Sequence, residues 1–208
     1  MEPAFRFGAS FRVASPFGKG GAMAGFMLLA LLAGLAAPAG GQTAPSSAEV
    51  AAYDGLFRAA HAGDAAAIRR LVAEGASVDA RDARGRTPAH VAGFASNDDA
   101  LRALAEAGTD MNALEGDAYD VVTIAAVAND AALMDLAIAL GNDPGLVTSP
   151  YDGTALIAAA HLGHVDVVRR LIAAGAPLDH INNLHWTAVL EAVLLGDGGA
   201  DHQAVLDA

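Results

Sequence analysis

The stretch TALIAAAHLGHVDVVRRLIAAGA, residues 154–176, predicts two short helices folded back on each other. Thr154 can cap the first helix, because its hydroxyl can accept a hydrogen bond from a free amide of the first turn. Gly163 permits the positive φ of a tight inter-helix turn, and Gly175 is placed for a left-handed C-cap. Apolar residues recur at helical spacing in the second helix, namely Val165, Val168, Leu171 and Ile172. A unit this small cannot bury its own apolar face and needs neighbours.

The same pattern repeats along the chain. The glycines that close a helical pattern are 33, 33 and 34 residues apart, at Gly75, Gly108, Gly141 and Gly175. A helix-capping residue recurs at Asp54, Thr87, Asp120, Thr154 and Thr187. The inter-helix turn reads Gly63, Ser96, Asn129, Gly163 and Gly196, and all of these except the serine tolerate the left-handed conformation well. The spacing predicts five consecutive helix pairs.

Two stretches resemble the ankyrin repeat family closely: DARGRTPAHVA at 82–92 and GTALIAAAHLGHVDVVRRLIAAGA at 153–176. The resemblance extends from about residue 48 to residue 208, and implies an all-α solenoid of helix-turn-helix units with hairpin-like connecting loops. The expected units are about 48–78, 79–112, 113–144, 145–178 and 179–208, the last one incomplete. The third unit departs most from the family, because Asp120-Val121-Val122 replaces the usual Thr-Pro-Leu.

The two ends of the array have their own signals. Ser46 and Glu49 have the spacing of a capping box, and one polar first helix is expected over Ala48–Ala62. In the fifth unit, the second helix begins near Asp201, close to the last residue of the sequence. The apolar residues expected to lack a following partner are Val189, Val193, Val205 and Leu206. We therefore expect a fragment of a longer protein, the alternative being an end that is frayed or docked on something.

The first 39 residues have the order of a secretory signal peptide. Three basic residues precede an apolar run over 22–37, and Ala37-Pro38-Ala39 offers a small-x-small cleavage site. The apolar run is shorter than the roughly 20 residues that a membrane-spanning helix needs, so cleavage near Ala39 is expected over an uncleaved anchor. Residues 40–47 then form a linker, and the mature chain is expected to be periplasmic or secreted, without a membrane anchor.

Charge and cysteine content exclude several classes of protein. Removal of residues 1–39 leaves nine Arg and no Lys against 23 acidic groups, a net charge of −14. Such a surface repels phosphate backbones, so we expect no nucleic-acid partner. The chain has no cysteine, which excludes disulfides, thiolate metal sites and a lipoprotein anchor.

No catalytic or metal-binding arrangement is evident in the sequence. His161 and His164 have a spacing that can bind zinc on one helix, but Gly163 turns the chain between them and no third ligand is near. The resemblance gives His164 and His90 structural roles, the latter linking turns of adjacent repeats. We expect no enzyme, no cofactor and no metal.

The candidate site is a column of residues that each precede a capping position. It reads Tyr53, Arg86, Tyr119, Gly153 and Trp186, which includes two of the three tyrosines and the only tryptophan. The resemblance implies that this column is exposed toward a concave groove, and these residue types dominate interface energetics. Further candidates are Phe94 and His161 late in the first helices and Tyr151 at a hairpin tip. The alternative is that the rings pack against neighbouring hairpins.

The expected function is a non-catalytic module that binds another protein. Exported bacterial proteins of similar sequence are generally scaffolds or inhibitors, and some are linked to periplasmic catalase and oxidative-stress defence, so the resemblance allows an envelope or oxidative-stress enzyme as the partner. The alternatives are a secreted effector that binds host proteins, a structural protein of the cell envelope, and a metal-dependent or hydrolytic enzyme.

Overall fold

The computed structural model describes residues 42–208, a stack of short helices. The predicted signal peptide and the first two linker residues lie outside the described residues. The helices are α2 Ser47–Ala52, α3 Gly55–Ala62, α4 Ala65–Ala73, α5 Pro88–Phe94, α6 Asp98–Glu106, α7 Val121–Val127, α8 Ala131–Ala139, α9 Ala155–Leu162, α10 Val165–Ala173, α11 Ala188–Leu194 and α12 Ala200–Leu206. Between residues 42 and 208 there is no strand, only an isolated bridge between Thr148 and Gly153. No helix in this range is long and apolar enough to cross a bilayer.

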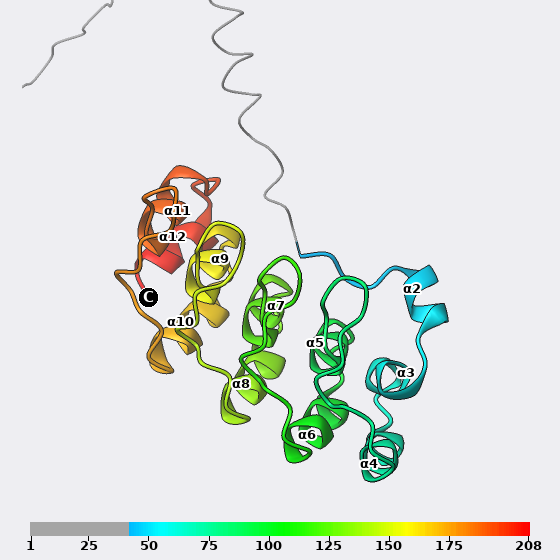
Figure 1. Cartoon of the computed structure of the whole chain (residues 1–208). Coiled ribbons are helices and arrows are strands. Elements are labelled where there is room, and N and C mark those ends of the chain that lie inside the picture. Colours follow the sequence, from blue (N-terminus) through cyan, green and yellow to red (C-terminus); the bar gives the residue numbers. More distant parts are fainter. Residues whose placement is uncertain (1–41) are drawn as a thin grey trace, which may run out of the picture. The chain divides into compact units, whose positions relative to one another are not determined.

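The helices after α2 form five antiparallel pairs that stack in chain order (Figure 1). Each first helix contacts the first helix of the next pair, from α3 through α5, α7 and α9 to α11. The second helices form a parallel row from α4 to α12. The prediction of an all-α solenoid of helix pairs is confirmed.

The helix starts follow the predicted capping column. Thr87, Asp120, Thr154 and Thr187 each cap a first helix and accept a hydrogen bond from the amide three residues later. Asp54 occupies the equivalent position but makes no such side-chain bond. The five starts are therefore confirmed, and four of them are fixed by the capping side chain.

The predicted left-handed turns are correct in four of five units. Gly63, Ser96, Asn129 and Gly163 have φ between 52° and 71°. Ser96 adopts this conformation although serine disfavours it, and its hydroxyl donates a hydrogen bond to the Asp130 carboxylate of the next unit. Gly196 was expected in the same conformation and is not; in the expanded turn Gly198 takes it, with φ 69°. Gly196 is needed for a different reason, because a Cβ there would lie 2.2 Å from the carbonyl oxygen of Ala192.

The expected single helix over Ala48–Ala62 is wrong, because the chain breaks at Tyr53 and Asp54. Tyr53 is extended, at φ −62° and ψ 139°, so α2 ends before it and α3 begins at Gly55. The Tyr53 ring stacks on Phe57 with centroids 5.5 Å apart. The short helix α2 begins with the predicted capping box, in which Ser46 and Glu49 bond each other reciprocally.

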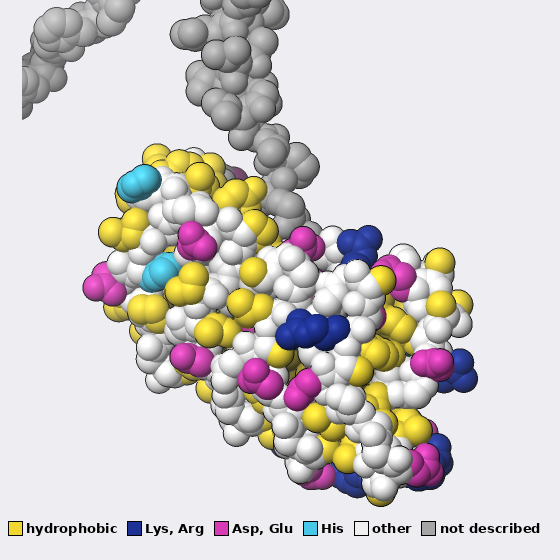
Figure 2. Space-filling view, viewed as in Figure 1, with side chains coloured by type: hydrophobic (Ala, Val, Ile, Leu, Met, Phe, Trp, Pro, Cys, Tyr) yellow, Lys and Arg dark blue, Asp and Glu magenta, His cyan; other side chains and the backbone are white. Residues whose placement is uncertain are grey.

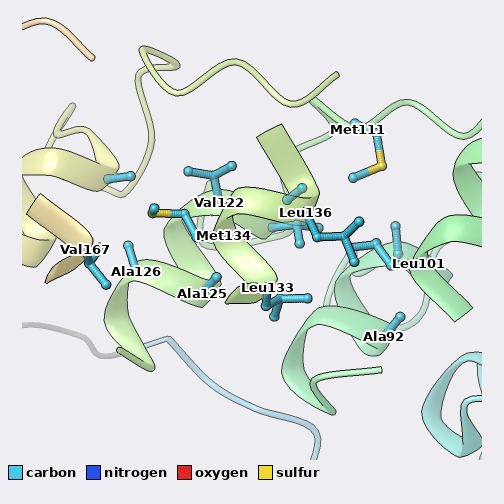
Figure 3. Packing of buried hydrophobic residues seen from close by; sticks show 14 of the residues in the cluster. Ala92, Leu101, Met111, Val122, Ala125, Ala126, Leu133, Met134, Leu136 and Val167 are labelled. Carbon is cyan, nitrogen blue, oxygen red and sulfur yellow. The ribbon is translucent and has the colours of Figure 1, made fainter. Parts of the chain in front are cut away.

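The core is thin because alanines line the first helices. Ala60, Ala92, Ala125 and Ala159 are buried at 1% exposure or less, which lets neighbouring helices approach closely. Larger side chains of the second helices fill the space behind them, as Figure 3 shows for Leu101, Leu133, Met134 and Val167. The core continues without a gap from α3 to α12.

The last unit is more complete than the sequence indicated. α12 is a formed helix, and Val205 is buried in the core cluster, so the expectation that Val205 lacks a partner is wrong. The reason is that α12 packs on α10 and α11 as each earlier second helix does. Val189, Val193 and Leu206 are exposed, as expected.

Candidate functional site

The predicted aromatic column is largely buried in the structure. Tyr53, Arg86 and Tyr119 are exposed by only 8%, 1% and 7%, whereas Trp186 is half-buried. The expectation that the column faces a partner from an exposed surface is therefore wrong for its first three side chains. The physical reason at Arg86 is that residues 42–52, which precede the first helix pair, bond its guanidinium through Thr43 and Glu49.

Arg86 holds that N-terminal segment in place. Its Nε donates to Asp82 Oδ2 at 2.7 Å, and its Nη2 donates to Glu49 Oε1 at 2.6 Å. Its Nη1 donates to the carbonyl oxygen of Thr43 at 3.3 Å, and the Tyr53 hydroxyl donates to Asp82 Oδ2 at 2.9 Å. The guanidinium thus joins a hairpin of the second unit to the chain on both sides of the α2 start. We call these five residues the Arg86 clamp.

The electrostatics of the clamp agree with its geometry. Hydrogen bonds from Ser46, and then the contact with Arg86, lower the pKa of Glu49 to about 2. Burial alone would raise the pKa of Asp82, but hydrogen bonds from Arg86 and the Arg84 amide outweigh it and lower that pKa. Burial and the bond to Asp82 raise the pKa of the Tyr53 hydroxyl. The clamp therefore has two carboxylates and one guanidinium, all charged at neutral pH.

Tyr119 belongs to the backbone frame of the hairpins. Its carbonyl oxygen accepts from His90 Nε2 at 3.0 Å, and its amide donates to Glu115 Oε1 at 3.2 Å. Nδ1 of His90 accepts from the Thr87 amide, so the ring is neutral with its proton on Nε2. Burial lowers the pKa of His90 to about 4. The predicted role of His90 in linking adjacent repeats is confirmed.

The four remaining predicted site residues, Trp186, Phe94, Tyr151 and His161, are all half-buried. Two of them are brought together by one polar chain of contacts. Asn182 Oδ1 accepts from the Trp186 amide at 2.9 Å, and Asn182 Nδ2 donates to Glu191 Oε1 at 3.0 Å. Glu191 Oε2 lies 3.1 Å from His161 Nδ1. These contacts hold the last hairpin against α9 and α11.

The two histidines with a zinc-binding spacing face different partners. His161 Nδ1 lies against Glu191, while His164 Nδ1 lies 2.9 Å from the carbonyl oxygen of Ala126. Over residues 42–208 no group of three His, Asp or Glu side chains is placed to hold a metal ion. His164 thus ties the fourth unit to the third.

Exposed apolar side chains, which the sequence pattern only partly indicated, gather in the last two units. Within the described chain, every large apolar residue that is exposed lies between residues 147 and 206: Val147, Leu162, Leu178, Ile181, Leu184, Val189, Leu190, Val193, Leu194, Leu195 and Leu206. Figure 2 shows such side chains gathered over the end of the stack formed by α11 and α12. Apolar surface of this extent is typical of an interaction site.

Part of this surface belongs to a second column of apolar residues, which runs along the stack at the C-terminal ends of the first helices. Phe94 and Val127 lie at the ends of α5 and α7 and are half-buried. Leu162 and Leu194 end α9 and α11, and Leu195 is the C-cap of α11; they are 41%, 56% and 47% exposed. We call these five residues the inner column. Its apolar character was visible in the sequence, but the increase in exposure toward the C-terminal units was not.

Comparison with known proteins agrees with this architecture. The family model described as ankyrin repeats (3 copies) matches residues 122–205. An ankyrin repeat protein of Escherichia coli (strain K12), YahD, is 28% identical over 149 residues, which are 71% of this chain and 74% of that protein. The crystal structure of an ankyrin repeat domain from Acinetobacter baumannii AYE is 39% identical and superposes with a TM-score of 0.67, covering 73% of this chain and 76% of that one. Ankyrin repeats are generally protein–protein interaction modules. The stacked helix pairs, their caps and these similarities together show that this chain belongs to the ankyrin repeat family.

Proposed function

We propose that this protein is a non-catalytic module of the periplasm that binds a partner protein through the inner column. The observation that carries the proposal is the exposure of Leu162, Leu194 and Leu195, which occupy two adjacent repeating positions at the ends of α9 and α11. Desolvation of such side chains contributes roughly 25 cal/mol per Å² of buried apolar surface. Rigid helices also hold the column in place, so little conformational entropy is lost on binding.

The net charge of the chain favours a partner of complementary charge. The chain from residue 40 onward carries a net charge of −14, and charge of one sign raises the association rate of oppositely charged proteins. A basic or neutral protein with an exposed apolar patch therefore fits this surface best. His161, which precedes Leu162 in α9, is half-buried.

Affinity capture from a periplasmic extract tests the binding surface. The bait is the wild-type chain beside a Leu162→Ser/Leu194→Ser double variant. The matched control is Val147→Ser/Leu178→Ser, which removes two equally exposed apolar side chains that are outside the inner column. We expect one protein to be retained by the wild type and the control and lost with the inner-column variant. Equal retention by all three forms would disprove the assignment of the binding surface.

Export is tested separately. The proposal is supported by the basic, apolar and small-residue order of residues 1–39. Mass spectrometry of the protein recovered from the periplasmic fraction is expected to find Gly40 as the first residue. A full-length chain in the membrane fraction would contradict it.

A further inference from the structure

Residues 42–46 lie across the stack before α2 begins. Gln42 and Ala44 form one wall of a cleft of about 250 Å³, and the Thr43 carbonyl oxygen is held by Arg86. The opposite wall is formed by the ends of α5 and α7 and the start of α8: Gly93, Phe94, Ser96, Ile124, Val127, Ala128, Asp130 and Leu133. Figures 1 and 3 show this segment as a blue trace that passes α7 and α5. The segment therefore covers the half of the inner column that carries Phe94 and Val127.

The segment has the conformation of a bound extended peptide. Residues 42–46 have no helix or strand of their own, and Pro45 restricts Ala44 to extended geometry. A buried guanidinium fixes one of its backbone carbonyl groups, a contact that does not depend on the side chain at that position. The same contact can be made by any peptide that runs in this direction.

The fit of the segment to the cleft is poor. Ala44 is itself exposed and offers a single methyl group to a cleft of about 250 Å³ that is open to solvent. Gln42 Nε2 is buried and has no acceptor among the described residues. An unfilled apolar space and an unsatisfied donor both weaken the contact.

We propose that this cleft is a binding site for an extended peptide of the partner that places a large apolar side chain between Phe94 and Val127, and that residues 42–46 are a weak ligand of the same site held in cis. The inference rests on the proposed function, because the cleft is part of the inner column. Attachment to the same chain gives the segment an effective concentration of the order of millimolar, so a poor fit suffices to cover the site. A partner displaces it by filling the space that Ala44 leaves empty.

Filling the cleft in cis tests the geometry. In the full chain, Ala44→Leu is expected to raise the melting temperature by about 2–4 °C, because a leucine side chain reaches into the part of the cleft that the exposed alanine methyl leaves open. The matched control is Thr43→Leu, which adds the same side chain at a neighbouring position that is also exposed but does not line the cleft, and it should give no rise. In a Val127→Asp background the Ala44→Leu gain should disappear. An equal rise in the control, or an undiminished gain beside Val127→Asp, refutes the site.

Binding of a free peptide tests whether residues 42–46 occupy the site as a ligand. The probe is a fluorescein-labelled, end-blocked peptide of residues 42–47 with leucine in place of Ala44, measured by fluorescence anisotropy. We expect the full chain carrying Ala44→Asp to bind it at least tenfold more tightly than the chain carrying Ala44→Leu, because a charged side chain leaves the apolar cleft and a leucine blocks it. Equal affinities overturn the inference.

The outcome is distinguishable from failure of the proposed function. Partner capture through Leu162 and Leu194 together with equal peptide affinities would leave the proposed function standing and remove only the inference. If the peptide binds the Ala44→Asp chain more tightly than the Ala44→Leu chain but no partner is captured, the inference stands and the proposed function fails.

Discussion

Replacement of Arg86 by alanine should destabilise the N-terminal third of the array strongly. The Arg86 side chain is 1% exposed and bonds Asp82, Glu49 and the Thr43 carbonyl oxygen. Removal of one partner of a buried ion pair costs about 3–5 kcal/mol, because the other charge stays buried without a counter-charge. The Asp82 side chain is 10% exposed but that of Glu49 is 29%, so water can solvate part of what is left. We therefore expect the lower end, about 3 kcal/mol.

The measurement is thermal unfolding followed by circular dichroism at pH 7. In a chain of this size each kcal/mol shifts the melting temperature by about 2–4 °C, so Arg86→Ala should lower it by about 6–12 °C. The control is Arg170→Ala, since the Arg170 and Asp135 side chains are 45% and 47% exposed and such pairs contribute about 0–1 kcal/mol. If Arg86→Ala melts within 3 °C of Arg170→Ala, the Arg86 clamp does not stabilise the start of the array and the reasoning is refuted.

The pH dependence gives a second readout of the same clamp. The folded pKa values of Glu49 and Asp82 are lower than the unfolded ones, so both carboxylates stabilise the fold at neutral pH. Their contribution is lost as the pH falls from about 4.5 toward 2. In Arg86→Ala, which lacks the cation, the decline in stability over this window should be shallower than in the wild type.

Three further predictions concern the rest of the array. Burial lowers the pKa of His90 to about 4, so between pH 6.5 and 4 the unfolded chain binds a proton that the folded chain does not. The free energy of unfolding measured in urea should therefore fall by about 3 kcal/mol over this range. The His90→Gln variant should not show this fall. The hydrogen bond to the His161 carbonyl oxygen, followed by the contact with Asp197, raises the pKa of His202. The contribution of His202 to stability is therefore full below pH 6.5 and is lost at higher pH. Amide hydrogen exchange in α12 should be faster in His202→Gln than in the wild type at pH 5.5, and equal in the two at pH 9. Leu104→Ala should cost about 2–5 kcal/mol in unfolding experiments because Leu104 is fully buried, whereas exposed Leu178→Ala should stay within about 0.5 kcal/mol.

The fold could be predicted from the sequence because its determinants are local and repeat. In the three middle helix pairs, a threonine or aspartate cap and a residue in the left-handed conformation fix the pair without reference to distant residues. The exceptions arise where the repeat is interrupted. In the expanded turn after α11 the positive φ moves from Gly196 to Gly198, and the 33-residue period carries no information on that choice.

The burial of the aromatic column could not be predicted in the same way. The period indicates which residue of one unit faces the next unit, but α2 and residues 42–46 have no counterpart in the other units. Two signals were present: Asp82 is four residues before Arg86, and the Ser46–Glu49 capping box placed a carboxylate near the start of the array. The pairing of Glu49 with Arg86 joins residues 37 positions apart, so only the three-dimensional structure reveals it.

Residues 42–46 cover only the N-terminal half of the inner column. At the N-terminal end, charged and polar groups of the Arg86 clamp fix a non-repeat segment over Phe94 and Val127. At the other end Leu162 and Leu194 have no such cover among the described residues and are exposed. A partner therefore meets open apolar surface at the last two units first and must displace residues 42–46 to extend its contact toward α5. Binding in this order predicts that the affinity of the partner depends on Leu162 in every form of the chain, but on Val127 only when the segment can be displaced.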